Sequence, residues 1–183
     1  TFLGTAGKIN DNDVDAEKIK NADLVFLEGY LWDEGEPKKA FDKAIKNAKK
    51  VAMSLSDIFC VERHKSQFLE LVKNKLDIIF ANEQEILSLT NSNSFKEVIS
   101  FCKQIGKNVV ITRGEKGAIS ICNNEIHECN AAKNLNIKDL TGAGDLFAAG
   151  FLHGFINKMS ISESLEKGTE LSAKIIQKIG ARI

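Results

Sequence analysis

Short apolar runs alternate with longer segments of helical periodicity as far as residue 113. The runs, which we expect to form strands, cover residues 22–29, 50–55, 76–81 and 108–113. The segments of helical periodicity cover residues 36–49, 57–74, 82–90 and 94–105. Continuous apolar runs of this length are typical of strands buried on both faces of a parallel sheet. The repeated strand–helix order predicts right-handed crossovers and an open, mostly parallel α/β sheet with helices on both faces.

The pattern changes after Arg113. Two short segments, "GAISIC" and "EIHEC", flank Asn123-Asn124, a pair that favours a hairpin turn. We therefore expect antiparallel strands at the C-terminal edge of the sheet. Two further helices are predicted at about 142–157 and 161–179. Since no linker or repeat interrupts the pattern, residues 1–183 are predicted to form a single α/β core.

The composition narrows the classes of partner. The chain carries 25 basic and 25 acidic residues, so its formal net charge is zero, and 43% of its residues are apolar. A neutral chain has no long-range field that attracts nucleic acid or an anionic membrane, so an anion must be bound at a local site. No apolar stretch reaches the ~20 residues of a membrane helix. The cysteines show no metal-type spacing, and we expect buried or half-buried thiols in a reducing cytosol.

The stretch "DLTGAGDLFAAGF" at residues 139–151 combines a helix start with close-approach glycines. Thr141 can cap the helix, and Gly142-Ala143-Gly144 would form its first turn. Unpaired amides at a helix N-terminus bind anions, and glycines let a phosphate approach the backbone. Asp145 in the same turn is stabilised in its ionised form by the helix dipole, so it could accept a proton beside the anion. The alternative is that Asp145 only favours the helix start.

A dinucleotide-binding fingerprint is a second interpretation of this stretch. Phe147 stands where that fingerprint requires its third glycine, and the stretch lies far from a first βαβ unit. These two departures disfavour a dehydrogenase.

Residues 139–145 resemble the D-T-x-G-A-G-D signature of the ribokinase-like (PfkB) family of carbohydrate and nucleoside kinases, with Leu140 in place of the usual threonine. The resemblance implies that Asp145 is the base that activates a substrate hydroxyl. It also implies an anion hole made by the amides of Gly142, Ala143 and Gly144. Asp139 is then expected to support the turn at the end of a strand.

Two further motifs match the same family in order and separation. In "ANEQE", Asn82 and Glu85 form a capping-box pattern, and they also match the family's N-x-x-E motif, which implies that Glu85 helps to hold Mg²⁺ through water with Asn82 beside it. Glu83 is expected to face solvent.

The other motif is "ITRGEKG". Thr112, Gly114 and Gly117 match the family's T-x-G-x-x-G turn, which implies contact with the nucleotide phosphates. Taken alone, the same letters also fit a hairpin in which Arg113 and Lys116 are solvated.

Other stretches resemble the adenosine-kinase-like branch of the family, namely "SLSDIFC", "VERHKSQF" and "GAGDLFAAGFLHGF". In "GTELSAKIIQKIGARI" the resemblance implies a wall for the adenine base, with Gly168, Ser172, Ala173, Ile176 and, upstream, Thr141 as nucleotide-binding residues. The alternative for the small residues is packing between helices. The loop "NAAKNLNI" is expected on the other side of the adenine.

The resemblance implies an ATP-dependent and Mg²⁺-dependent phosphotransferase that acts on a hydroxyl of a sugar or nucleoside, with adenosine as the first candidate. We expect a cytoplasmic monomer or homodimer without nucleic-acid or membrane partners. The chain begins inside an apolar run, and we expect it to be a nucleotide-binding and catalytic core that lacks an N-terminal lid and substrate region. The alternative function is an ATP-binding module that is catalytically incomplete.

Overall fold

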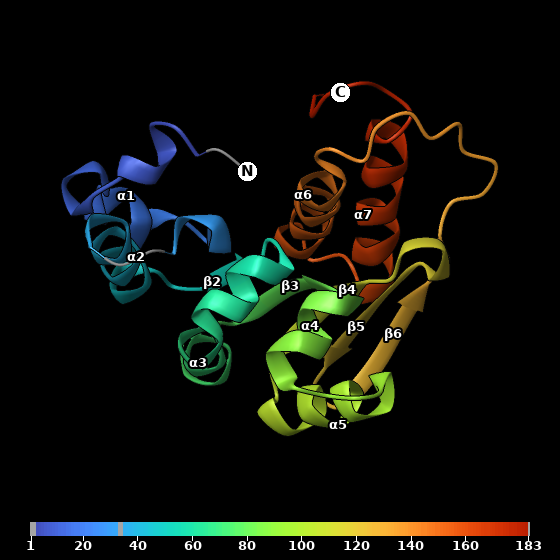
Figure 1. The fold of residues 1–183 in the computed structure, drawn as a ribbon, viewed down its shortest axis with the longest axis horizontal. Coiled ribbons are helices and arrows are strands. Elements are labelled where there is room, and N and C mark those ends of the chain that lie inside the picture. The colour runs from blue at the N-terminus through green and yellow to red at the C-terminus, as the bar shows by residue number, and fades with distance from the viewer. Residues whose placement is uncertain (1–2, 33–34, 183) are drawn as a thin grey trace.

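A computed structural model describes residues 3–32 and 35–182. Its centre is a six-stranded sheet in the order β1-β2-β3-β4-β5-β6 (Figure 1). The strands are β1 (Val25–Glu28), β2 (Val51–Ser54), β3 (Ile78–Asn82), β4 (Asn108–Thr112), β5 (Ala118–Cys122) and β6 (Glu125–Cys129). Neighbours from β1 to β4 pair in parallel, whereas β4–β5 and β5–β6 pair antiparallel. The predicted sheet, including its antiparallel C-terminal edge, is confirmed.

The helices follow the predicted order, with one addition. They are α1 (Ala16–Asn21), α2 (Glu36–Asn47), α3 (Ile58–Asn74), α4 (Glu83–Thr90), α5 (Phe95–Ile105), α6 (Ala143–Ile156) and α7 (Ile161–Ile175). Short 3₁₀ turns lie at η1 (Ala6–Lys8), η2 (Asp11–Asp13), η3 (Gly29–Leu31) and η4 (Gly114–Lys116). The hairpin turn at Asn123 and Asn124 has positive φ at both residues, as its sequence predicted.

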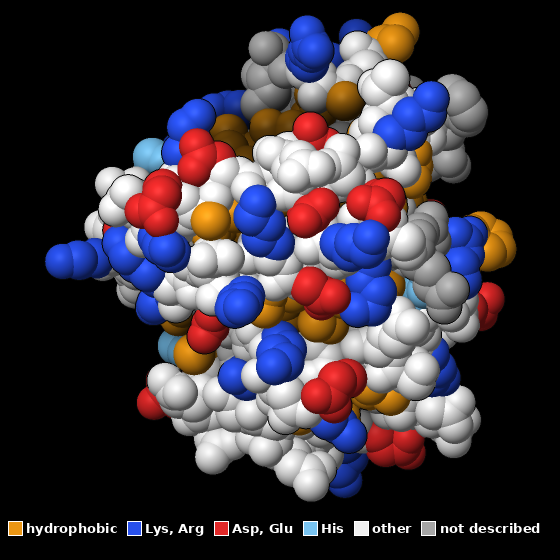
Figure 2. All heavy atoms as spheres, turned by 90° about the vertical axis from the view of Figure 1, so that its left-hand side faces the viewer, with side chains coloured by type: hydrophobic (Ala, Val, Ile, Leu, Met, Phe, Trp, Pro, Cys, Tyr) orange, Lys and Arg blue, Asp and Glu red, His pale blue; other side chains and the backbone are white. Residues whose placement is uncertain are grey.

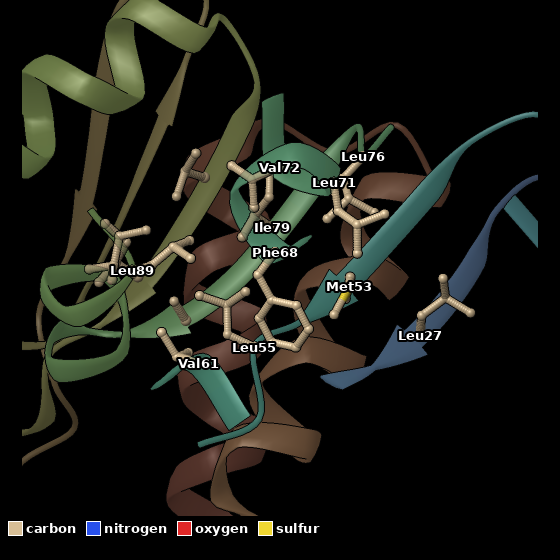
Figure 3. Close-up of a cluster of buried hydrophobic side chains, with 14 of the residues drawn as sticks. Leu27, Met53, Leu55, Val61, Phe68, Leu71, Val72, Leu76, Ile79 and Leu89 are labelled. Atoms are coloured by element: carbon tan, nitrogen blue, oxygen red, sulfur yellow. The ribbon is translucent and has the colours of Figure 1, made fainter. Parts of the chain in front are cut away.

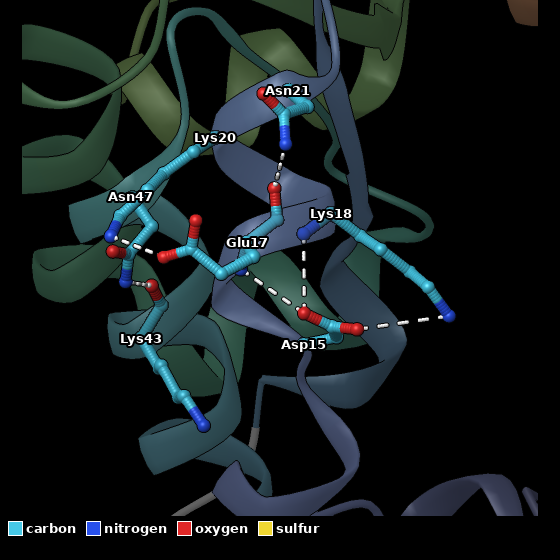
Figure 4. A network of polar contacts seen from close by, with 7 residues as sticks. All are labelled: Asp15, Glu17, Lys18, Lys20, Asn21, Lys43 and Asn47. Atoms are coloured by element: carbon cyan, nitrogen blue, oxygen red, sulfur yellow. Dashed lines mark hydrogen bonds and ion pairs between the residues drawn. The ribbon is translucent and has the colours of Figure 1, made fainter.

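The additional helix, α1, is short and polar. Asp15 caps it by accepting hydrogen bonds from the amides of Glu17 (3.1 Å) and Lys18 (3.2 Å), as Figure 4 shows. None of its residues is buried, so it lacks the apolar stripe from which a helix is recognised in a sequence.

Helices cover both faces of the sheet, and each face has its own apolar core. One core joins the strands to α2–α5 through residues such as Met53, Leu55, Phe68 and Ile79 (Figure 3). The other joins them to α6 and α7 and includes Phe80, Val110, Phe147, Phe151 and Leu165. Because successive residues of a strand point to opposite faces, two cores require apolar residues at every position. This requirement explains the continuous apolar runs.

The surface on the α1–α2 side carries mixed charges. Figure 2 shows acidic and basic side chains interspersed over that face, with no area of a single sign. Within the part of the chain that the structure describes, no helix has both the length and the apolar character needed to cross a membrane.

The cysteines are free thiols in buried or half-buried positions, as expected. Cys60 and Cys102 are buried, and Cys122 and Cys129 are partly buried. Burial raises the pKa of the Cys102 thiol to about 12, so this thiol stays protonated and packs as an apolar side chain.

Helices α6 and α7 pack at close range through Gly168. A Cβ atom at Gly168 would lie 2.8 Å from the carbonyl oxygen of Phe147 and 3.1 Å from its ring. Gly168 therefore belongs to the helix contact, which was the alternative that its sequence left open.

Replacing Gly168 tests this close contact. Gly168→Ala should lower the free energy of unfolding by about 1–3 kcal/mol, because the added methyl group meets a backbone atom that cannot move aside. Chemical denaturation measures the change. Gly144→Ala is the matched control in α6, since a Cβ there has no neighbour within 4 Å, and it should not destabilise the protein. Equal stability of Gly168→Ala and the wild type would contradict the assignment.

Candidate active site

The candidate site lies at the edge of the sheet where the parallel strands end. β1 ends at Glu28, β2 at Ser54, β3 at Asn82 and β4 at Thr112, and the ends of β2, β3 and β4 lie in stretches singled out in the sequence. In open α/β sheets, ligands bind beyond the carboxyl ends of the strands. The first turn of α6 belongs to the same region, since the charge of Asp145 acts on Glu28 at the end of β1.

Asp139 holds the turn that leads into α6. Its Oδ1 accepts hydrogen bonds from the amide of Thr141 (2.9 Å) and from the Thr141 hydroxyl (2.7 Å), and its Oδ2 accepts one from the amide of Gly180 (2.9 Å). The bond from the Thr141 hydroxyl, followed by the amide bonds, lowers the pKa of Asp139. One carboxylate thus ties the α6 turn to the C-terminal segment.

The N-cap of α6 differs from the prediction. Gly142 is the N-cap residue, in the left-handed region at φ 78°, and it makes no side-chain cap. The prediction that Thr141 caps the helix is therefore wrong, because its hydroxyl donates to Asp139 instead.

The first turn of α6 leaves amides open to a ligand. The amide of Ala143 donates to the carbonyl of Leu140 (3.1 Å), so it departs from the expected set of anion-binding amides. Within the described residues, the amides of Gly142, Gly144 and Asp145 have no acceptor. A Cβ at Gly144 would meet no atom within 4 Å, so the space in front of this turn is free. The arrangement fits a bound anion.

Asp145 is exposed and shares its surroundings with Glu28. Partial burial raises the pKa of Glu28, and the charge of Asp145 raises it further. Glu28 was not a predicted site residue. In the sequence, Glu28 is a carboxylate at the end of an apolar run, which predicts the end of a strand. The sequence does not predict that the first turn of α6 lies close to it.

Asn82 and Glu85 form a complete capping box at the start of α4. The amide of Glu85 donates to Asn82 Oδ1 (2.8 Å), while the backbone amide and Nδ2 of Asn82 donate to Glu85 Oε2 (2.9 Å) and Oε1 (2.6 Å). Glu85 is only 5% exposed, and burial raises its pKa; the Asn82 amide opposes this shift and the charge of Asp57 adds to it.

These contacts restrict how a metal ion could be held. Both oxygens of Glu85 already accept hydrogen bonds from Asn82. The described residues contain no group of three or more His, Cys, Asp or Glu placed to hold a metal ion. A carboxylate that already accepts two hydrogen bonds fits an ion that it contacts through water, which is a habit of Mg²⁺.

The predicted phosphate turn follows β4. Gly114 and Gly117 have φ of 58° and 86°. A Cβ at Gly117 would lie 2.0 Å from the carbonyl oxygen of Cys129, so only glycine fits there. The amide of Arg113 donates to the carbonyl of Gly117 (2.8 Å) and closes the turn. The turn therefore packs against the end of β6, while Thr112 and Gly114 stay at the site edge.

Glu83 does not face solvent, contrary to the prediction. Its Oε2 lies 3.0 Å from Arg113 Nε and its Oε1 lies 3.5 Å from Lys116 Nζ. Its side chain is only 24% exposed. Arg113 is thus partnered and only 21% exposed, whereas Lys116 stays 65% exposed to solvent.

The residues of the predicted adenine wall lie in α7 and at its C-terminal end. Gly168 is buried against Phe147 and lies one turn before Ser172. Ala173 lines a cavity of about 620 Å³ between α7 and residues 128–132. Ile176 accepts hydrogen bonds at its carbonyl from the amides of Lys138 (2.8 Å) and Asp139 (3.3 Å), so it anchors the loop before α6. Ser172 is partly buried one turn before Ile176, and its carbonyl accepts the Ile176 amide (3.2 Å).

The sheet, the open amides of α6 and the neighbouring carboxylates define an α/β protein whose helix α6 begins at the carboxyl edge of the sheet with amides that lack an acceptor within the described residues. The chain belongs to the pfkB family of carbohydrate kinases, because the sequence model of that family matches residues 1–183.

Solved structures and curated proteins agree with this assignment. The adenosine kinase of Sinorhizobium meliloti has a TM-score of 0.93 and 34% identity, over 97% of this chain and 56% of that chain. The cytidine kinase of Thermococcus kodakarensis is 35% identical over 115 residues, which are 61% of this chain and 41% of that protein. An E. coli protein of ribokinase type, solved with ATP and Mg²⁺, is similar in fold alone, with a TM-score of 0.85, 20% identity and coverage of 96% and 59%. The chain spans about half the length of these relatives.

Replacing Asp139 tests its role as a tie. Its lowered pKa means that the ionised form stabilises the fold above the usual aspartate pKa of about 3.9, and that this contribution is lost as the pH falls through the lower folded-state value. Asp139→Asn should therefore be less stable than the wild type at neutral pH, and the difference should shrink below pH 4. Thermal unfolding at several pH values measures it.

Asp23→Asn is the control for this experiment. Asp23 is exposed, so its replacement should leave stability unchanged. A pH-independent difference for Asp139→Asn would show that its carboxylate charge does not matter.

Proposed function

We propose that the intact protein is an ATP-dependent kinase that transfers the γ-phosphate to a hydroxyl of a sugar or nucleoside, with adenosine as the first candidate. The observation that carries the proposal is the first turn of α6, where the open amides of Gly142 and Gly144 adjoin the exposed carboxylate of Asp145. Membership of the pfkB family supports the reaction class. Relatives named as adenosine kinase and cytidine kinase support a nucleoside as the acceptor.

In this proposal the hydroxyl oxygen of the acceptor attacks the γ-phosphorus, and its proton passes to Asp145. The bond between the γ-phosphorus and the bridging oxygen breaks, and the electron pair leaves with ADP. The open amides of α6 stabilise the charge that gathers on the transferred group. Glu28 lies near Asp145 and, in the proposal, contacts the acceptor from the end of β1.

The residues also fit a nucleotide and its magnesium ion. Thr112, Gly114 and Gly117 would hold the phosphates, and the cavity beside Ala173 would take the adenine base. Glu85, supported by Asn82, would hold Mg²⁺ through water. The ion, when bound, neutralises phosphate charge.

A second candidate is a nucleotide-binding module that lacks part of the machinery for transfer. Release of ADP in the presence of adenosine or ribose distinguishes the two candidates, because the module would bind ATP and release none.

Replacing the proposed base tests the mechanism. In the intact protein, Asp145→Asn should lower turnover by about 10²–10⁴-fold, because the amide cannot accept the proton, while ATP still binds. Steady-state kinetics and calorimetric titration with ATP measure the two effects. Asp42→Asn, an exposed carboxylate of α2 paired with Lys38, is the control and should keep full activity. An Asp145→Asn enzyme that retained most of its rate would refute the assignment.

Replacing Gly144 tests the anion site separately. Gly144→Val should weaken ATP binding by about tenfold or more, because its side chain enters the space in front of the open amides, and tenfold corresponds to ~1.4 kcal/mol. Calorimetric titration with ATP measures the affinity. Leu146→Val, in the same turn but without a glycine to lose, is the control. Unchanged affinity in Gly144→Val would place the phosphates elsewhere.

A further inference from the structure

Two of the proposed nucleotide-binding motifs begin side by side and then separate. Asn82 at the end of β3 is the register partner of Thr112 at the end of β4. Directly after this pair, β3 leads into α4, which begins at Glu83, and β4 leads into the η4 turn, which begins at Gly114. Beyond the last ladder position, side chains must hold the two motifs relative to each other.

One carboxylate spans the gap between them. Glu83 is the first residue of α4, and its Oε2 accepts a hydrogen bond from Arg113 Nε (3.0 Å). Glu83 thus belongs to the turn that contains Asn82 and Glu85, whereas Arg113 belongs to the turn that contains Thr112 and Gly114. The contact joins residues 30 positions apart in the chain.

The arginine is fixed from a second side by an aromatic ring. The guanidinium carbon of Arg113 lies 3.9 Å from the ring centroid of Phe95, the first residue of α5. A planar guanidinium can stack on a ring and pair with a carboxylate at the same time, which a lysine ammonium does less well. Arg113 therefore has its orientation set by both partners.

Partial burial strengthens this pair relative to an ordinary surface pair. The side chains of Arg113 and Glu83 are 21% and 24% exposed, whereas Lys116, the other cation near Glu83, is 65% exposed. Screening by water and salt weakens exposed pairs most. The first turn of α4 also favours a carboxylate through the helix dipole. Arg113 is therefore the principal partner of Glu83.

We propose that Glu83 and Arg113 are a positioning pair that holds the Asn82/Glu85 turn and the Thr112/Gly114/Gly117 turn at the separation required to bind ATP. The pair acts through the two turns. The inference rests on the proposed function for the identity of the ligand, and it adds two residues that the family motifs leave unspecified.

The test measures the Kd and the KM for ATP in the intact protein. The variants are Glu83→Gln, Arg113→Lys and the double variant. Each single variant should raise the Kd and the KM for ATP by about tenfold, with kcat and the KM for the acceptor changed less than about threefold. The double variant should be no worse than either single variant, since both remove the same interaction. Lys96→Gln, an exposed cation of α5 next to Phe95, is the control and should bind ATP as the wild type does.

Different outcomes would overturn the inference. If Arg113 itself contacted a phosphate, Arg113→Lys would weaken ATP binding while Glu83→Gln would leave it unchanged or tighten it. If the pair were only structural, both variants would unfold at lower temperature and keep the wild-type Kd below that temperature. If Arg113→Lys did not fold, Phe95→Leu would replace it, since it removes the stack and keeps both charges, with the same tenfold rise expected.

Wild-type titration separates this inference from the proposed function. A wild-type protein that does not bind ATP would refute the proposed function, and the ligand assigned to the pair with it. A wild-type protein that binds ATP, together with variants of unchanged Kd, would refute the pair alone.

Discussion

The packing of α6 against the sheet and against α7 is the constraint on which the site depends. Phe147 and Phe151 are buried under the sheet, and the ring of Phe151 meets that of Phe80 on β3 edge to face at 5.5 Å. On its other side, α6 has Gly150, where a Cβ would lie 2.6 Å from the carbonyl of Lys167. Because the helix axis is fixed by these contacts, the position of its exposed first turn follows from the core. The buried residues of α6 thus determine where Asp145 lies.

The core could be predicted well because its signals are local. Strands buried on both faces read as continuous apolar runs, and residues 50–55 and 108–113 became β2 and β4 with little change in bounds. Signals that depend on a single capping residue were less reliable. Thr141 satisfies the rule for an N-cap, yet Asp139 two residues earlier competes for its hydroxyl, and Gly142 takes the cap position in a left-handed conformation. Helix α1 escaped prediction because it buries no residue.

The site could be predicted only where its residues are neighbours in the chain. Asn82 with Glu85, and Gly142 with Asp145, are close in sequence, and their spacing carries the information. Glu28 and Asp145 are brought together by the fold, and so are Glu83 and Arg113, whose approach depends on the register of Asn82 with Thr112. The sequence alone does not specify which residues of two strands pair. The position of Glu83 beside Arg113 could therefore not be predicted, and Glu83 was wrongly expected to face solvent.

Charge at the ligand edge determines which anions can bind there. The open amides of α6 attract an anion, but the carboxylates around the edge repel it, and they also repel one another. Burial raises the pKa of Glu28 and of Glu85, and the charges of Asp145 and Asp57, respectively, raise it further. A free phosphate would be attracted by the amides and repelled by the carboxylates. A phosphate that carries a divalent cation would be attracted by the amides, and its cation would be attracted by the carboxylates. Under the proposed function, this balance of charges therefore suits a phosphate that binds together with a divalent cation better than it suits a free phosphate.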